Sequence, residues 1–281
     1  MSQHPNGFSE FIRSRHSARA FLPDPIPAEV IEQVLIDAQS APSNSNTQPW
    51  NVHLVGGTAL QDLSAALIAE FDKNGINPDF TIDYGQGVHL QRSQALAAKM
   101  YGLLGIARED KEARTEFVRE NLRFFGAPHT ALLFIPPMGD RIRAAFDQGT
   151  YAENFLLSLQ AHGYRGVPQG MISLLAPTVR EFLGVDEEHK LVTALTFGIC
   201  RRVQSCVQHS PGPCPAVRDG NCSWHRRPQA RLAALVLVQL GEDLFAQVHV
   251  GVDVLDIVRV LKSVDEAEDL TGIICLQRYL D

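Results

Sequence analysis

The stretch TALLFIPP at residues 130–137, followed by FDQGTYAENFLLSLQAH at residues 146–162, decides the fold class. Thr130–Ile135 is a short, continuous apolar run that two prolines end, which is typical of a strand buried on both faces. Phe146–His162 carries little charge, which indicates a long helix with most of its circumference covered. A buried strand next to a buried helix predicts a layered domain of α and β structure.

Helical and strand patterns alternate on both sides of this stretch. Ala28–Ala38 has apolar residues at the three-four spacing of one buried helix face, and Asn51–Val55 alternates like a strand before two glycines end it. Strands separated by helices predict an α+β domain. We expect its other elements at Phe8–His16 (helix), Ala59–Phe71 (helix), Gln91–Phe125 (two helices split near Asp110) and Leu191–Phe197 (buried strand).

The composition excludes several classes of protein. With 281 residues, 45% of them hydrophobic and 20% charged, the chain can bury a core of one large domain or two modest ones. A net charge of −7 with scattered basic residues gives no electrostatic footprint for nucleic acid or acidic lipid. The chain has no apolar run long enough to span a bilayer, and its first residues are polar. We therefore expect a cytoplasmic protein whose partners are small molecules or other protein chains.

The segment Arg15-His16-Ser17-Ala18-Arg19 places two guanidinium groups and a hydroxyl within five residues, just after a predicted helix. Arginine offers phosphate a planar fork of donors, and serine adds a short hydrogen bond. The spacing suits an anion clamp. Taken alone, it also suits two exposed arginines at the end of a helix.

Residues 41–50, APSNSNTQPW, form a polar, amide-rich connection between a predicted helix and a predicted strand. The donors and acceptors of Ser43, Asn46 and Gln48 can match the edge of a planar heterocycle. The alternative is a plain turn in which Ser43 or Asn44 caps a helix. Trp50 opens the following strand, so we expect it in the core.

A third segment, GYRGVPQG at residues 163–170, follows the long apolar helix. Its three glycines let backbone approach a ligand closely, so main-chain N–H groups would make the contacts. The alternative is a simple connection between two helices.

In chain order, these segments resemble the flavin-dependent nitroreductase family, specifically the branch that includes nitroaromatic-acid reductases. The resemblance covers Phe8 to Gly198 and implies a three-layer α+β fold with a central mixed sheet flanked by helices. The family motif Arg-x-Ser-x-Arg matches Arg15, Ser17 and Arg19 and implies contacts to the phosphate of FMN and the polar edge of its flavin. His16, between these arginines, is then interpreted as a phosphate or flavin contact rather than a proton donor.

The other two segments match family motifs that imply further cofactor contacts. Ser-x-x-Asn-x-Gln-Pro-Trp implies contacts to the flavin and its ribityl chain, and Pro-Gln-Gly implies backbone hydrogen bonds near the reactive flavin nitrogen. The matching residues are Ser43, Asn46, Gln48, Pro49 and Trp50 for the first motif, and Pro168, Gln169 and Gly170 for the second.

The resemblance also implies an activity and an assembly. NAD(P)H would reduce FMN and leave, and the reduced cofactor would pass electrons to a nitro group or a similar small-molecule acceptor at the same face. The cofactor carries this chemistry, so no acid, base or nucleophile needs to stand out in the sequence. The family builds its flavin site at a homodimer interface. The same motifs would also fit a flavin dehalogenase or a dehydrogenase of another acceptor.

The composition changes abruptly after residue 199. All five cysteines lie beyond it, and Cys200–Arg231 has six arginines against Asp219 as its one acidic residue. An odd number of cysteines argues against a disulfide framework, and their spacing lacks the paired Cys-x-x-Cys of zinc sites. We favour free thiols in a Pro- and Arg-rich linker over a metal site. The cysteine run, with its nearby histidine, is Cys200, Cys206, Cys214, Cys222 and His225.

A shift of reading frame would account for this change. Back-translating Gly198–Pro213 and reading one nucleotide later permits Gly-Tyr-Ala-Asp-Glu-Ser-Asn-Pro-Ala-Ser-Asn-Thr-Ala-Arg-Ala-Pro, which looks like the usual family tail. The hypothesis divides the chain into a nitroreductase-like domain, 1–198, and an out-of-frame segment, 199–281. The competing interpretation is a genuine extension with apolar segments at Leu232–Leu240 and Val248–Leu261. Displacing the family's basic tail residues would leave at most a catalytically impaired flavin-binding protein.

Overall fold

The computed structural model describes residues 5–201 and 273–276. Its centre is a five-stranded sheet in the order β3-β4-β2-β1-β5. Every pairing in this described sheet is antiparallel, so the expectation of a mixed sheet is wrong in strand direction. The strands are β1 (Asn51–Gly56), β2 (His129–Ile135), β3 (Arg165–Gln169), β4 (Lys190–Gly198) and β5 (Ile273–Leu276).

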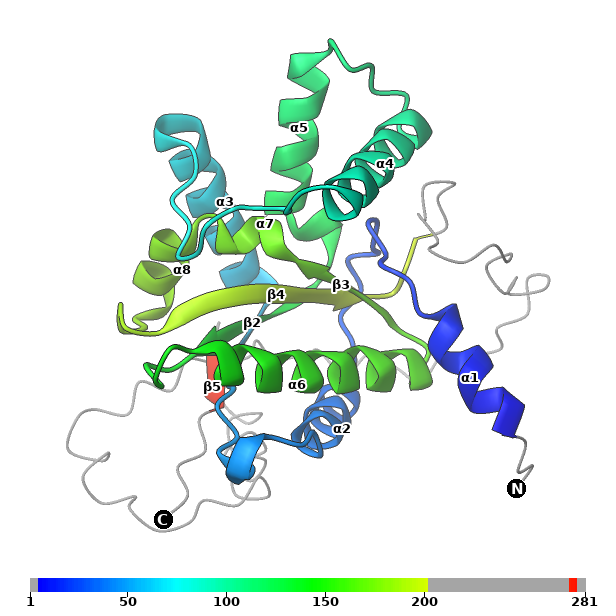
Figure 1. Cartoon of the computed structure of the whole chain (residues 1–281), viewed down its shortest axis with the longest axis vertical. Helices are drawn as coiled ribbons and strands as arrows, with labels where there is room; N and C mark the ends of the chain where they lie inside the picture. The colour runs from blue at the N-terminus through cyan, green and yellow to red at the C-terminus, as the bar shows by residue number, and fades with distance from the viewer. Residues whose placement is uncertain (1–4, 202–272, 277–281) are drawn as a thin grey trace.

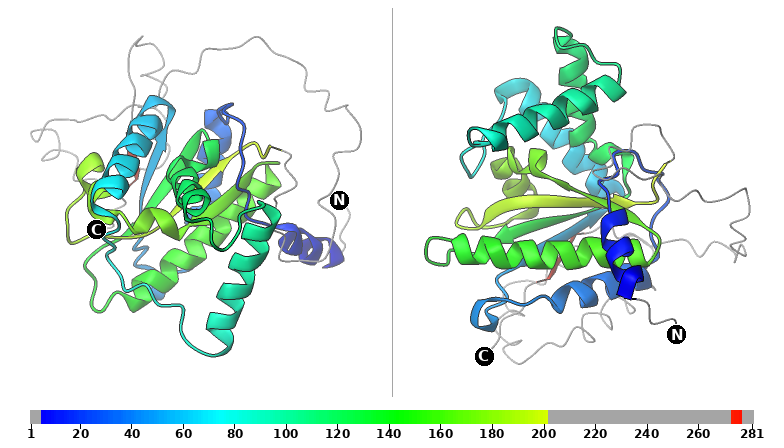
Figure 2. Two further views of the ribbon diagram at one scale, coloured as in Figure 1. Left: turned by 90° about the horizontal axis from the view of Figure 1, so that it is seen from above. Right: turned by 45° about the vertical axis from the view of Figure 1, so that its right-hand side comes forward.

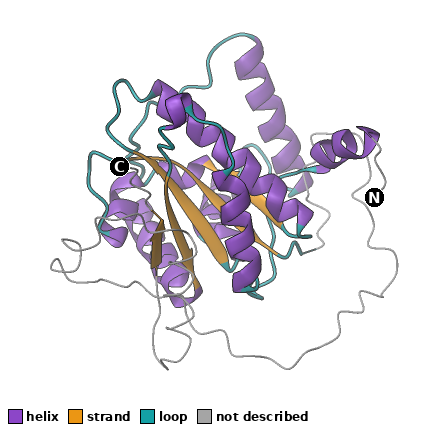
Figure 3. Ribbon diagram, turned by 90° about the horizontal axis from the view of Figure 1, so that it is seen from below, coloured by secondary structure: helices purple, strands orange, loops and turns teal. Residues whose placement is uncertain are grey.

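Helices cover both faces of the sheet, which confirms the α+β, three-layer arrangement (Figures 1 and 3). On one face lie α2 (Ala28–Gln39) and α6 (Ile142–Ala161). On the other lie α3 (Gly57–Asn74), α5 (Lys111–Leu122), α7 (Gly170–Ser173) and α8 (Ala176–Leu183). Two helices project from this body, α1 (Pro5–Ser14) and α4 (Val88–Leu103), as the turned views of Figure 2 show. Two short 3-10 turns complete the described elements, η1 (Asn44–Asn46) and η2 (Phe124–Gly126).

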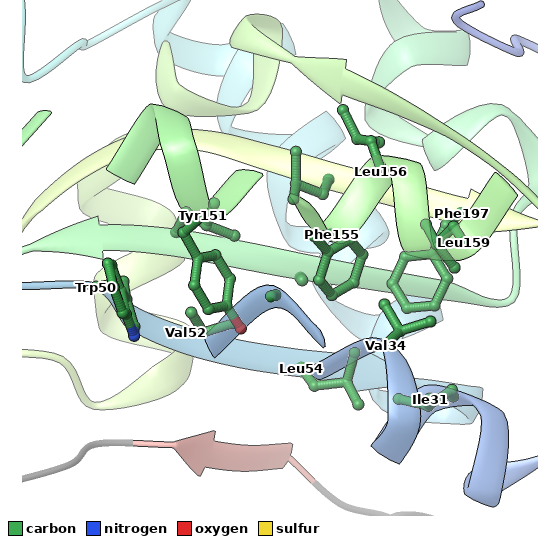
Figure 4. Close-up of a cluster of buried hydrophobic side chains, with 14 of the residues drawn as sticks. Ile31, Val34, Trp50, Val52, Leu54, Tyr151, Phe155, Leu156, Leu159 and Phe197 are labelled. Atoms are coloured by element: carbon green, nitrogen blue, oxygen red, sulfur yellow. The ribbon is translucent and has the colours of Figure 1, made fainter. Parts of the chain in front are cut away.

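The core beneath the sheet is built from one face of α6. Tyr151, Phe155 and Leu159 point from this helix toward β1 and α2 (Figure 4). Trp50 lies in this cluster with its ring centroid 5.1 Å from that of Tyr151, which confirms the expected core position. Most residues of the predicted range Phe146–His162 are buried or half-buried, as expected for a largely covered helix, although Phe146 itself is 72% exposed.

The strands and helices predicted from periodicity are all present, with ends shifted by a few residues. α6 begins at Ile142, one turn before the predicted start, and α4 ends at Leu103, seven residues before Asp110. β3 was not predicted, because Pro168 and Gly166 weaken the strand signal. β3 lies at the edge of the sheet and pairs only with β4 among the described strands, and an edge strand tolerates proline.

The connection between α3 and α4 is tied to the body by a buried carboxylate. Asp79 Oδ2 accepts hydrogen bonds from Arg180 Nη1, at 2.5 Å, and from the backbone N–H of Leu191, at 3.0 Å. The Asp79 side chain is 5% exposed and that of Arg180 is 11% exposed. This pair joins the connection to α8 and to the start of β4.

A buried histidine joins the N-terminal segment to β2. Nε2 of His129 accepts a hydrogen bond of 3.0 Å from the backbone N–H of Ile26, and the ring stacks on Phe197. Burial lowers the pKa of His129 from 6.5 to about 4. Protonation would turn Nε2 into a donor facing another donor, so the fold requires the neutral ring.

The stability of the fold is therefore expected to decrease in mild acid. The unfolded chain takes up a proton near pH 6.5, whereas folded His129 stays neutral until about pH 4, so its contribution is lost as the pH falls through this window. At about pH 5 the loss from this group is about 2 kcal/mol. Urea unfolding between about pH 7 and pH 5 checks this against His129→Gln, which lacks the titrating ring. An identical pH dependence in the variant would contradict the assignment.

Several expectations lie outside the described residues. They are those for Cys206, Cys214, Cys222, His225, Leu232–Leu240 and Val248–Leu261. Within the described part of the chain, no group of three or more His, Cys, Asp or Glu residues could hold a metal ion. None of the described helices is long and apolar enough to cross a membrane.

Candidate functional site

The anion clamp, which we define as Arg15, Ser17 and Arg19, follows α1 directly. Nε of Arg15 lies 3.7 Å from the carboxylate of Glu153 on α6. Its Nη1 is buried and has no hydrogen-bond partner among the described residues. A buried guanidinium donor without an acceptor is costly, so this atom marks a place where an anionic or carbonyl group would be stabilised.

The neighbours of Arg15 are buried or half-buried, and two of them contact nearby backbone carbonyls. His16 is buried, and its Nδ1 lies 3.0 Å from the carbonyl oxygen of Ser14. Ser17 and Arg19 are half-buried, and Nη1 of Arg19 donates to the carbonyl of Ser17 at 3.4 Å. The clamp is therefore a compact turn rather than a pair of arginines extended into solvent.

The clamp lies beside the point where the chain leaves β4. The backbone N–H of Arg201 donates to the carbonyl of Ala20, and that of Leu22 donates to the carbonyl of Ile199, both at 2.9 Å. Phe21 and Cys200 form an antiparallel bridge between these bonds. Arg201 therefore pairs with Ala20, one residue beyond the clamp.

The amide loop, Ser43–Gln48, has an unusual backbone. Ser45, Asn46 and Gln48 have φ values of 51°, 58° and 45°, in the left-handed region that residues other than glycine rarely adopt. Each such residue costs about 1–2 kcal/mol. The loop persists because Ser43 Oγ accepts a 3.0 Å hydrogen bond from the backbone N–H of Gln48 and closes it. Ser43 therefore closes the loop rather than capping a helix.

The rim of the amide loop is polar and accessible. Asn46 is exposed and Gln48 is half-buried, and Nε2 of Gln48 donates to Oδ1 of Asn46 at 3.2 Å. The two amides orient one another and keep further donors and acceptors for a ligand. Pro49 and Trp50 are buried behind them.

The strand-end turn, Pro168–Gly170, joins β3 to α7. Gln169 is 3% exposed, and its side-chain amide forms hydrogen bonds inside the protein. Nε2 donates to the carbonyl of Asn121 at 3.0 Å, and Oε1 accepts from the hydroxyl of Thr196. Pro168 and Gly170 are exposed, and the space next to Gly170 is open. The amide of Gln169 is therefore not available to a ligand, and backbone contacts from this turn remain a prediction.

Helix α6 connects these segments. It contacts the clamp through Glu153, and it contacts Asn44 of the amide loop through Asp147 and Arg143. β3, which leads into the strand-end turn, packs so closely on α6 that a Cβ on Gly166 would lie 2.7 Å from Leu156 Cδ2. The clamp and the amide loop therefore contact α6 directly, and the strand-end turn is linked to it through β3.

The side chains that hold these segments could not be predicted from the sequence motifs. They are Glu153, Asp147 and Arg143 on α6, and Thr196 on β4. The role of Asp147 could have been suspected from the sequence, because a carboxylate in a largely apolar helix needs a hydrogen-bonding partner.

The donor set fits FMN. The clamp offers the unpartnered Nη1 of Arg15, which a phosphate or a flavin carbonyl can satisfy, and the positive charge of Arg19 lies in the same segment. The amide loop and the strand-end turn add neutral donors and acceptors, which suit the edge of a flavin.

The chain is similar to known proteins in sequence and in fold. Nitroreductase NfnB from Mycolicibacterium smegmatis is 41% identical over 189 residues, which is 66% of this chain and 80% of the relative. A 4-nitrobenzoate reductase from Pseudomonas putida is 31% identical over 192 residues, covering 68% of this chain and 84% of the relative. The crystal structure of FMN-dependent nitroreductase NfnB from Mycobacterium smegmatis, in complex with NADPH, superposes with a TM-score of 0.66 at 38% identity, covering 69% of this chain and 88% of that one.

A model of the nitroreductase family matches residues 12–199, about two thirds of the chain. This range includes the clamp, the amide loop and the strand-end turn. From the match and the relatives together, we conclude that the chain belongs to the nitroreductase family.

Proposed function

We propose that this protein is an FMN-dependent oxidoreductase that uses NAD(P)H to reduce nitroaromatic or related small-molecule acceptors. The buried, unpartnered Nη1 of Arg15 carries the proposal, since a bound anion or flavin oxygen gives it the acceptor that the described protein lacks. The M. smegmatis relative, which is FMN-dependent and binds NADPH, supports the choice of cofactor and electron donor.

Each segment has a proposed part in holding FMN. Arg15, Ser17 and Arg19, with His16 beside them, contact the phosphate and the polar edge of the flavin. Ser43, Asn46 and Gln48 contact the flavin and the ribityl chain, and the backbone of Pro168–Gly170 donates near the flavin nitrogen. The amide loop can contact FMN held by its own chain or FMN held by a second copy of the chain.

The chemistry itself comes from FMN, which when bound accepts a hydride and passes electrons on. The protein binds the donor and the acceptor in turn at one face, which makes the proposed kinetics ping-pong. The side chain of Gln169 is fixed by Asn121 and Thr196, so the backbone of the turn is held rigidly for hydrogen bonding. No side chain is assigned as a general acid, base or nucleophile.

A homodimer is part of the proposal. None of the residues of α4 is buried, although the helix contains Val88, Leu90 and Leu103. Phe8 and Ile12 of α1 are also exposed. Two projecting helices with exposed apolar side chains are suited to cover a second copy of the chain. A cytoplasmic location is also proposed, and cell fractionation tests it.

We also propose that residues 1–198 form the catalytic domain and that the reading frame shifts near Gly198. The change in cysteine and arginine content supports this division. The place where the chain leaves the domain supports it too, because the family's basic tail residues would start beside the clamp. One observation favours a genuine extension instead, namely that Ile273–Leu276 pairs with β1 as an added strand.

One experiment tests these proposals together. The gene is resequenced across Gly198, and the chain is purified as given and with the alternative frame restored. We expect the restored protein to be a yellow dimer with one FMN per chain, oxidising NADPH when a nitroarene is added. The chain as given should retain less FMN. A colourless, inert protein from both genes would contradict the proposed function, and an unambiguous in-frame gene would end the frame hypothesis.

A further inference from the structure

The amide loop is held by one buried carboxylate. Oδ2 of Asp147, on α6, accepts a hydrogen bond of 3.0 Å from the backbone N–H of Asn44. Asp147 is only 2% exposed, and no Lys, Arg or His side chain forms an ion pair with it in the part of the chain that the structure describes. A buried carboxylate without a cation is costly, so the hydrogen bond that it accepts must offset part of that cost.

Neighbouring side chains of the same helix face hold the same end of the loop. Nη1 of Arg143 donates to Oδ1 of Asn44 at 3.1 Å, and the Thr150 hydroxyl lies 2.7 Å from the carbonyl oxygen of Asp147 and 3.0 Å from that of Pro42. Residues 143, 147 and 150 follow the three-four spacing of one helix face. One turn beyond Asp147, Tyr151 packs against Trp50 at the other end of the loop.

The loop needs this support because its own backbone is unfavourable. Ser45, Asn46 and Gln48 keep positive φ values, and such conformations persist only where the surroundings fix them. The Asn44 N–H lies immediately before the first of these residues. Asp147 therefore accepts the hydrogen bond at the point where the loop enters its strained conformation.

We infer that Asp147 is a positioning residue that holds the amide loop in its ligand-binding conformation by accepting the Asn44 N–H. The inference rests on the proposed function, in which Asn46 and Gln48 contact the flavin. Asp147 itself touches no cofactor or substrate. It acts through the backbone of Asn44, so its removal releases the loop and moves both amides away from their ligand.

The test uses the full chain, with two substitutions of Asp147 and one matched control. Asp147→Ala removes the acceptor, whereas Asp147→Asn keeps an oxygen that can accept the Asn44 N–H. Asp37→Ala is the control, since Asp37 also joins α2 to α6, through the Ser158 hydroxyl at 2.5 Å, without contacting the loop. Amide hydrogen exchange over residues 43–48 and the Kd for FMN are measured for each protein, together with the Tm.

We expect Asp147→Ala to speed exchange in the loop and raise the Kd for FMN, each about tenfold, the scale of one lost hydrogen bond. Asp147→Asn should stay within about threefold of the wild type. Asp37→Ala should lower the Tm and leave both loop readouts unchanged. At saturating FMN, Asp147→Ala should raise KM for the acceptor more than it lowers kcat, because the loop is displaced and no reacting group is lost.

Two results would overturn the inference. One is loop exchange and FMN affinity in Asp147→Ala that match the wild type, and the other is an equal change in Asp37→Ala. If Asp147→Ala does not fold, Asp147→Leu fills a similar space without an acceptor, and an unaltered loop in that variant counts against the inference. A wild-type protein that binds no FMN would refute the proposed function, while the exchange measurement would still decide whether Asp147 holds the loop.

Discussion

Replacing Asp79 by alanine is expected to lower the free energy of unfolding by about 3–5 kcal/mol, the usual cost of removing one partner from a buried ion pair. Arg180 would keep a buried charge whose remaining described acceptor is the carbonyl of His189, at 3.3 Å. The backbone N–H of Leu191 would lose its acceptor at the start of β4. The substitution leaves a buried guanidinium without its carboxylate and a backbone N–H without its acceptor. The loss of stability therefore exceeds the loss from removing an ordinary surface charge.

Urea unfolding measures this loss, and Asp72→Ala provides the matched control. Asp72 pairs with Arg119 at 2.8 Å, but the two side chains are 43% and 29% exposed, far more than those of Asp79 and Arg180. Exposed pairs contribute about 0–1 kcal/mol, so the control should unfold close to the wild type. Similar losses in the two variants would show that the Asp79 pair is not the anchor of the connection between α3 and α4.

Replacing Arg15 by alanine should raise the Kd for FMN about 100-fold, because a hydrogen bond to a charged group contributes about 1.5–3 kcal/mol. The expected loss comes from the buried Nη1, which has no described partner in the protein alone. Arg15→Lys should fall between alanine and the wild type, since an ammonium keeps the charge and loses the planar fork.

Two control variants separate cofactor binding from folding. Arg13→Ala removes an exposed arginine two residues earlier, on α1, and should leave the Kd within about threefold. Glu153→Ala removes the carboxylate that faces Arg15 and should not weaken FMN binding. Fluorescence titration with FMN measures all the variants. A folded Arg15→Ala protein with wild-type affinity would remove Arg15 from the proposed site.

Periodicity predicted those elements whose own residues show, by their hydrophobic pattern, which faces are buried. β2 is buried along its whole length, and its short, continuous apolar run is the pattern that a strand covered on both faces requires. The split near Asp110 was also predictable, since Oδ1 of this residue accepts from the backbone N–H of Ala113 and begins α5. In each case the information lies within a few residues of the element.

The parts that were missed depend on distant partners. β3 is a strand because it pairs with β4, although its own proline and glycine disfavour the assignment. Asp147 meets Asn44 across 103 residues of sequence, a contact that no local pattern contains. Motif resemblance predicts which residues contact the cofactor, whereas the side chains that hold these segments in place are seen only in the fold.

The central claim is that the clamp, the amide loop and the strand-end turn hold one FMN. A crystal structure of the protein grown with FMN tests it most directly. We predict that the phosphate of FMN lies against Arg15 and that the flavin lies between Asn46 and the backbone of Gln169, with the amide loop coming from the same chain or from a second copy. FMN bound elsewhere, with these three residues facing solvent, would contradict the account.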